Sequence, residues 1–176
     1  QQNTSRQILL LNGDLFRNEL AHTKGVNARV RKNGAIGFAS SSHYSGLDSE
    51  LENVLGRAEE NASLLDSRLQ LKRGDFPASK AQSREDGLEM IKPLSSRDLM
   101  DFAAELDAYI LERYPKLTSR FVRTGMNEVE KLLYTSEGVR SHSYFTRSNV
   151  IFQLTMLGTD GNPVELHTVD GGLGTF

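Results

Sequence analysis

The sequence predicts an α+β fold in which largely antiparallel β hairpins are covered by amphipathic helices, arranged as two small sub-domains. Three observations lead to this prediction. Two Asn-Gly dipeptides each follow a strand-like run, two segments repeat apolar residues at helical spacing, and a long polar stretch separates those segments. The 176 residues suffice to bury a core, and 38% hydrophobic and 25% charged residues are typical of a soluble globular protein.

Residues 6–42 are predicted to form β hairpins. Asn12-Gly13 and Asn33-Gly34 each follow a short run of apolar or alternating residues. Asn-Gly accepts positive φ at both central positions of a tight turn, which matches the twist of the paired strands. The runs before the turns are 7–11 and 26–31, and the second turn leads into a return strand over 35–39.

The return strand and the segment after it are predicted to form a strand and a covering helix. Gly37 in the strand indicates a close backbone approach or a bulge rather than a ligand site. A helix is expected over 47–65, where apolar residues recur every three or four positions and form a stripe: Leu47, Leu51, Val54, Leu55, Ala58, Ala62 and Leu65. Four glutamates are expected off that stripe: Glu50, Glu52, Glu59 and Glu60. We interpret this helix as covering one face of a sheet, not as a membrane or partner helix.

Periodicity fades from Asp66 to Pro93, and structureless connections of that length are uncommon inside compact domains. We therefore expect a hairpin-plus-helix domain over 1–75, a linker over 76–94, and a helix-plus-antiparallel-sheet domain over 95–176. The chain is expected to stop before a carboxy-terminal domain.

The second sub-domain is predicted to open with a helix over 96–114. Ser95 and Asp98 resemble a capping box with Asp in place of Glu, and Pro115 ends the helix because proline lacks the backbone donor. Its inward face is expected to hold five apolar residues: Leu99, Phe102, Ala103, Leu106 and Ile110.

The rest of the second sub-domain is predicted to be β structure, with the run 150–156 as its best central strand. Turns are expected at 136–138 and at Asp160-Gly161, and the glycine-rich end 170–174 is expected to be too flexible for a strand. The predicted strands are 118–124, 128–135, 139–146, 148–157 and 163–169.

Charge and composition exclude several classes of protein. The formal net charge is −2, the pI is about 6.1, and the densest basic cluster is Arg29, Arg31 and Lys32. Only Arg29 and Arg31 share a strand face, which we interpret as a solvated face, so no direct nucleic-acid binding is expected.

No apolar run is long enough to cross a bilayer and no secretory signal opens the chain, so no membrane association is expected. The absence of cysteine excludes disulfides and thiolate ligands and fits a cytoplasmic location. Because the first residue is Gln1 rather than Met, we expect that a segment has been removed.

No catalytic, cofactor-binding or metal-binding residue is predicted in this chain. The histidines His22, His43, His142 and His167 include no pair four or five residues apart, so no helical zinc pair exists. Glu165 and His167 share one face of a predicted strand and form the best ligand pair, but such pairs usually face solvent.

Two other motifs are weak. Ser40-Ser41-Ser42 precedes His43 but lacks the G-x-S-x-G elbow of a nucleophilic serine, so we interpret it as a polar connection. The tail Gly171-Gly172-Leu173-Gly174 lacks the Lys-Ser or Lys-Thr that follows a phosphate-binding loop.

Four segments, in order, resemble the TldD/PmbA family, whose members have also been called modulators of DNA gyrase. Residues 25–30 and 33–41 resemble the family's "G-V-x-x-R-V … G-x-x-G-F-A-S-T" core, and the helix after them resembles its Ala-rich helix. Residues 134–139 are similar to the family's "N-S-E-G" turn, and 170–176 resemble its passage towards the carboxy-terminal half. The opening helix and strand usual before Gln7 look curtailed.

The resemblance implies a cytoplasmic peptidase assembly of two related subunit types, one zinc-bearing and one metal-free, which processes or degrades unfolded peptides. In the zinc-bearing type an H-E-x-x-x-H helix and a later cysteine supply the ligands, and this chain contains neither. The resemblance also implies that this chain holds no cofactor and that the intact protein holds zinc if it is the metal-bearing type. The partner it implies is a second copy, in a homodimer, or a related TldD/PmbA-type subunit.

Three readings follow. The first is an amino-terminal scaffold region of a TldD/PmbA-type zinc metallopeptidase subunit, acting in peptide maturation or degradation. The alternative is a non-catalytic binding or regulatory domain of the DNA gyrase modulator type. The third is an unrelated α+β fold whose hairpin matches the family core by chance.

Overall fold

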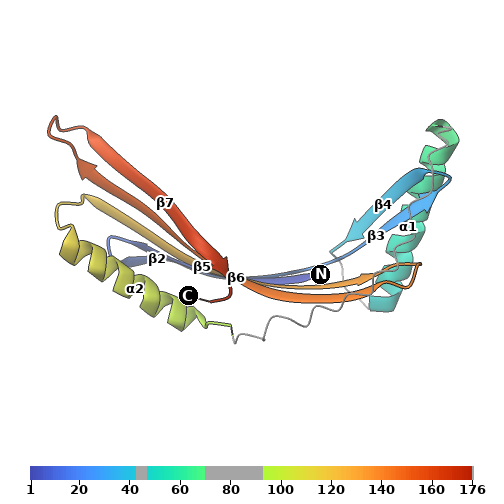
Figure 1. Ribbon diagram of the computed structural model, residues 1–176, viewed down its shortest axis with the longest axis horizontal. Helices are drawn as coiled ribbons and strands as arrows, with labels where there is room; N and C mark the ends of the chain where they lie inside the picture. Colours follow the sequence, from blue (N-terminus) through green and yellow to red (C-terminus); the bar gives the residue numbers. More distant parts are fainter. Residues whose placement is uncertain (43–46, 70–92, 176) are drawn as a thin grey trace. The chain divides into compact units, whose positions relative to one another are not determined.

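The computed structural model describes residues 1–42, 47–69 and 93–175 and confirms the α+β class (Figure 1). Its elements, in chain order, are β1 (Gln2–Leu11), β2 (Asp14–Lys24), β3 (Val26–Lys32), β4 (Ala35–Ser41), α1 (Leu47–Leu69), α2 (Ser96–Arg113), β5 (Ser119–Tyr134), β6 (Arg140–Leu157) and β7 (Pro163–Leu173). No helix of the described residues is long and apolar enough to cross a membrane.

The residues group into two compact units, each assembled from separate stretches of the chain. Unit 1 contains Gln1–Gln2, Thr23–Arg84 and Lys131–His142, and unit 2 contains Asn3–His22, Glu85–Glu130 and Ser143–Phe176. The first hairpin thus belongs to the unit that holds β7, although we expected it beside the first helix. The predicted linker, 76–94, lies almost wholly outside the described residues, and the domain boundary in the sequence stays a prediction.

In unit 1, β3 and β4 form a two-stranded antiparallel sheet in which Val30 pairs with Gly37. The predicted Asn-Gly turn between them is confirmed, since Asn33 has φ 47° and Gly34 has φ 95°. The two strands pack on α1 through a small core of Ala28, Ala39, Val54 and Ala58, with Val26 and Val30 beside it.

Gly37 lies where β4 and α1 approach each other closely, which is one of the two alternatives that the sequence left open at this position. A Cβ atom at this position would lie 1.9 Å from the carbonyl oxygen of Ala58 and 2.3 Å from the amide nitrogen of Ala62. Only a glycine leaves room for the backbone of the helix at this distance, and Ala58 and Ala62 are themselves fully buried.

The buried face of α1 is narrower than the apolar stripe predicted from the sequence. Val54, Ala58 and Ala62 are fully buried, but Leu55 and Leu65 are 48% and 38% exposed. Glu50, expected on the solvent face, is buried instead. The expectation for Glu50 was wrong. Only β3 and β4 are seen to pack on the helix in the described residues, and they cover less than the full apolar stripe. The helix also continues to Leu69, beyond the predicted end at residue 65.

Unit 2 is a five-stranded sheet in the order β2-β1-β5-β6-β7, with α2 packed on it (Figure 1). The predicted turn Asn12-Gly13 joins β1 to β2 with φ 53° and 90°. Asn12 is hydrogen bonded to Arg120, and Arg6 is paired with Glu128, so β5 runs antiparallel to β1. β7 is antiparallel to β6, with Leu154 opposite Leu166.

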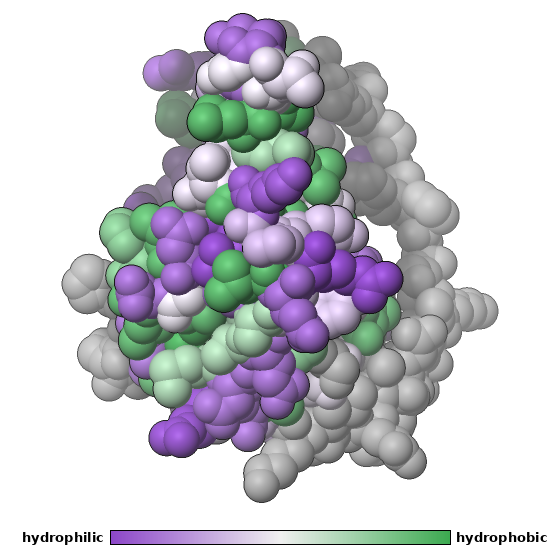
Figure 2. All heavy atoms as spheres, turned by 90° about the vertical axis from the view of Figure 1, so that its left-hand side faces the viewer, coloured by the Kyte–Doolittle hydropathy of each residue, from purple (hydrophilic) through white to green (hydrophobic). Residues whose placement is uncertain are grey.

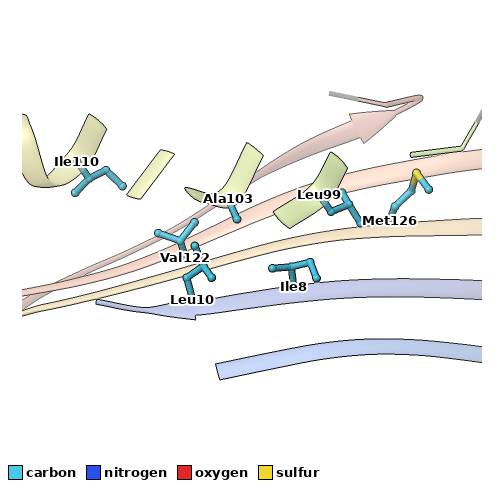
Figure 3. Packing of buried hydrophobic residues seen from close by; sticks show 7 residues of the cluster. All are labelled: Ile8, Leu10, Leu99, Ala103, Ile110, Val122 and Met126. Atoms are coloured by element: carbon cyan, nitrogen blue, oxygen red, sulfur yellow. The ribbon is translucent and has the colours of Figure 1, made fainter. Parts of the chain in front are cut away.

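The core of unit 2 lies between α2 and the central strands. Figure 3 shows Ile8 and Leu10 of β1 and Val122 and Met126 of β5 directed toward Leu99, Ala103 and Ile110 of α2. The helix begins as predicted, because the side chain of Ser95 accepts a hydrogen bond from the backbone of Asp98 and the Asp98 carboxylate accepts one from the Ser95 amide.

Three predicted strand boundaries in unit 2 were wrong. The predicted strands 118–124 and 128–135 are one strand, β5, and 139–146 and 148–157 are one strand, β6. Gly125 does not break β5, since it is buried where a Cβ would lie 3.1 Å from Oδ1 of Asn149. β1 likewise begins at Gln2, not at residue 7.

The glycine-rich end is a strand and not a flexible tail. Asp170 pairs with Val150 and Gly171 pairs with Asn149 in β7. A Cβ at Gly171 would lie 2.4 Å from the carbonyl oxygen of Ser148, so this glycine permits close strand pairing. Composition alone suggested flexibility, but the neighbouring strand supplies the hydrogen-bonding partners that hold the segment extended.

Candidate functional site

A buried ion pair joins the helix of unit 2 to its central strand. The Arg120 guanidinium donates hydrogen bonds from Nε to Oδ1 of Asp107 at 3.0 Å and from Nη2 to Oδ2 at 3.2 Å. The two side chains are 9% and 6% exposed. The Arg120 amide also donates to Oδ1 of Asn12 at 2.8 Å, and the Asn12 amide donates to the Arg120 carbonyl at 2.8 Å. The cluster thus joins α2, β5 and the first Asn-Gly turn.

A second polar cluster connects three strands of the same sheet. Arg6 of β1 forms an ion pair with Glu128 of β5, and the hydroxyl of Tyr144 on β6 donates to the other carboxylate oxygen of Glu128 at 3.1 Å. Partial burial, together with the hydrogen bond to the Glu128 carboxylate and its charge, raises the pKa of Tyr144. The phenol therefore stays protonated at neutral pH and acts as a hydrogen-bond donor rather than as a nucleophile.

Sequence reasoning missed both clusters, although the signal for one of them was present. Asp107 lies four residues after Ala103 and three before Ile110, so it falls on the predicted inward face of the helix. Arg120 alternates with Val122 and Thr124, both buried, and so shares their face of β5. Charged residues are almost never buried unless paired, so the two positions together could have indicated an ion pair, which the sequence analysis did not predict.

Glu165 and His167, the best ligand pair in the sequence, lie on β7 opposite Thr155 and Gln153. Both are exposed, as is every residue of β7. Within the described ranges, no group of three or more His, Cys, Asp or Glu side chains lies close enough to hold a metal ion. Zinc in proteins takes three or four such ligands, so the donor set of the described residues does not fit this metal.

The other weak motifs have structural positions. Ser40 and Ser41 lie at the end of β4 opposite Asn27 and Val26, and His43 lies outside the described residues. In the basic cluster, Arg29 lies over the ring of Phe38 with its Cζ 5.9 Å from the ring centroid. Lys32 donates to the hydroxyl of Ser63 on α1 at 3.0 Å.

The chain resembles one family and several solved structures. Residues 1–62 match the family model for the PmbA/TldA metallopeptidase domain 1. No curated protein gives a match. A structure from Thermotoga maritima described as a candidate modulator of a DNA gyrase has a TM-score of 0.68 at 16% identity, covering 98% of this chain and 38% of that one.

Two further structures share the fold. TldE from Thermococcus kodakarensis has a TM-score of 0.67 at 10% identity and covers 97% of this chain and 38% of its own. A candidate modulator of DNA gyrase from Bacteroides thetaiotaomicron has a TM-score of 0.68 at 15% identity, covering 98% and 39%. The chain therefore spans well under half the length of each of these structures.

Proposed function

We propose that this chain is the amino-terminal scaffold region of a TldD/PmbA-type metallopeptidase subunit, because residues 1–62 match the family model for domain 1 and the fold resembles that of the T. maritima structure. The intact subunit acts in peptide maturation or degradation, in the cytoplasm, on unfolded peptides. Its partner is a second copy or a related TldD/PmbA-type subunit, and the likeness to TldE supports a pairing of that kind. The region itself supplies sheets and covering helices and binds no nucleic acid.

One observation carries the scaffold role. The buried pair Asp107–Arg120 joins α2 to β5, and the partly buried pair Arg6–Glu128 joins β1 to β5, so both pairs are used within the unit's own elements. Catalytic acids and bases instead have an end free for substrate, commonly in a cleft that also shifts their pKa. These ion pairs therefore support a structural role for the most strongly desolvated charges of the unit.

We place the zinc ligands outside this chain. The family model that matches residues 1–62 is named for a metallopeptidase, and the chain spans only 38% of the T. maritima structure. The described donor set does not fit zinc, so no step of peptide hydrolysis is assigned to residues of this region.

The test compares this chain with the full-length protein in the cleavage of an unfolded fluorogenic peptide. We expect the full-length protein, alone or with its partner subunit, to lose activity on chelation and to regain it with zinc. This chain should cleave nothing with or without zinc and should bind no zinc in calorimetry. Peptide cleavage by this chain after metal stripping would refute the scaffold role. Zinc-independent behaviour of the full-length protein would refute the metallopeptidase assignment and favour a binding or regulatory domain.

A further inference from the structure

β2 is an edge strand of the sheet of unit 2 and exposes three large apolar side chains. In the strand order β2-β1-β5-β6-β7 it has one described neighbour, β1. Leu15, Phe16 and Leu20 are 50%, 66% and 53% exposed. Figure 2, which faces the left-hand side of Figure 1, shows exposed apolar side chains among polar ones. An exposed edge of this kind is a template for pairing with another strand.

The sequence of β2 is complementary to itself when reversed. Around Asn18, Arg17 is mirrored by Glu19, Phe16 by Leu20, Leu15 by Ala21, and Asp14 by His22. If two copies of this strand pair antiparallel about a two-fold axis at Asn18, each residue meets the mirrored residue of the other copy. The charges then fall opposite charges of the other sign, and the largest apolar side chains fall opposite each other.

The placement of the charges in the structure fits this register. Nη1 of Arg17 lies 3.7 Å from Oε2 of Glu19, so the two side chains share one side of the strand, and both are about half exposed. A two-fold axis at Asn18 would bring the second copy's Glu19 opposite Arg17 and its Arg17 opposite Glu19. Four charges of alternating sign would then lie together on one face, and two Phe16–Leu20 contacts on the other.

The opposite edge, β7, also exposes large apolar side chains, Val164, Leu166, Val169 and Leu173, but its backbone is less suited to pairing. β7 begins at Pro163, which lacks a backbone donor, and it contains Gly171 and Gly172 near its end. Proline is a common device that protects an edge, and a glycine offers no side chain to pack against a strand added at that edge. Between Asp14 and His22, β2 contains no proline and no glycine.

From these observations we propose that β2 is a self-association surface, through which two copies of this chain join their five-stranded sheets antiparallel about Asn18. The proposal deepens the assembly part of the proposed function and rests on that part. It requires no metal and no peptide, so it can fail or hold independently of peptidase activity.

Charge reversal tests the register. Arg17→Glu alone and Glu19→Arg alone each place like charges opposite one another twice in the symmetric pair, whereas the double variant restores opposite charges. In sedimentation experiments on the full chain, each single variant should weaken the dimer at least about tenfold, and the double variant should recover it. Recovery in the double variant also shows that the loss in the single variants is not misfolding.

A cysteine at the two-fold axis tests the surface itself. The chain has no cysteine, so Asn18→Cys introduces one thiol, which would face its own copy. Opposite Cα atoms in antiparallel strands are about 4.5–5.5 Å apart, within the range that a disulfide bridges. Mild oxidation should yield a covalent dimer for Asn18→Cys and little for His167→Cys, the matched exposed position on β7.

Several outcomes would overturn the proposal. They are a monomeric chain, a dimer that neither charge reversal weakens, or faster cross-linking through His167→Cys than through Asn18→Cys. The same cysteine in the full-length protein distinguishes other occupants of the edge. If Asn18→Cys cross-links this chain but not the full-length protein, another part of that protein covers β2 and the proposal is wrong for the intact assembly.

Discussion

Asp107 on α2 and Arg120 on β5 form a bidentate ion pair that lies almost wholly out of solvent, and the backbone of Arg120 is at the same time hydrogen bonded to Asn12. The pair therefore fixes three elements relative to one another: the helix, the central strand and the turn after β1. A Cβ at Gly13 would lie 3.2 Å from Oδ2 of Asp107, so the turn glycine also contacts this cluster.

Removing one partner of this pair should strongly destabilise unit 2. Asp107→Ala leaves the guanidinium of Arg120 buried without its counter-ion, and breaking a buried pair in this way costs about 3–5 kcal/mol. Replacing both residues by apolar ones of similar size, Asp107→Leu with Arg120→Met, should recover most of that loss. Urea unfolding of the three variants measures the difference. A double variant as unstable as Asp107→Ala would show that the charges themselves are required.

Glycine substitutions in unit 1 should have opposite effects at two positions. Gly37→Ala places a methyl group 1.9 Å from the backbone of Ala58, so β4 and α1 must separate, and overpacking of this kind costs about 1–3 kcal/mol or more. Gly56→Ala, on the exposed side of α1 with nothing within 4 Å, should stabilise the helix by about 0.5–1 kcal/mol. Thermal unfolding followed by circular dichroism compares the two, and equal effects would contradict the packing described here.

Tyr144 should make the stability of the chain decrease at alkaline pH. Its pKa is raised in the folded state, so the unfolded chain releases the phenolic proton first. The stabilisation is therefore complete below the ordinary tyrosine pKa of about 10 and is lost as the pH rises through the folded value. Urea unfolding at a series of pH values should show the free-energy difference between the wild type and Tyr144→Phe shrinking above that point.

A second variant separates the causes of this shift. Glu128→Gln keeps a hydrogen-bond acceptor for the Tyr144 hydroxyl but removes the carboxylate charge, so the pKa of Tyr144 should fall toward its ordinary value. The pKa is measured by following the absorbance of the phenolate as the pH is raised. The same titration of Tyr144→Phe, with and without Glu128→Gln, is subtracted so that only the signal of Tyr144 remains. No change in the pKa on Glu128→Gln would exclude the carboxylate charge as a cause and leave burial and the retained hydrogen bond.

The capping box of α2 should contribute a modest and local stabilisation. Ser95→Ala removes the acceptor for the Asp98 amide, and the loss of such a cap costs about 1 kcal/mol. Asp101→Asn, which breaks the exposed Arg97–Asp101 pair one turn later, should cost about 0.3–0.5 kcal/mol. Hydrogen exchange of the first-turn amides of α2 reports both changes, and a larger effect from Asp101→Asn would contradict this order.

The sequence by itself determined the local structure of the chain. Asn12-Gly13 and Asn33-Gly34 specify their turns because Asn-Gly tolerates the left-handed conformation. Ser95 and Asp98 begin α2 through hydrogen bonds to each other's backbone, and Pro115 follows its end because proline lacks the backbone donor that would continue it. Gly37 also indicated a close approach, and that inference held because a missing side chain is itself a local signal.

Only the tertiary structure decided which segments pair and which polar residues are buried. The first hairpin joins β5 instead of the first helix, and Gly171 lies within a strand, because both depend on hydrogen bonds from residues distant in sequence. The burial of Asp107 likewise depends on Arg120, which lies on a different element. Periodicity reports the apolar face of an element, whereas burial depends on how much of that face a partner covers.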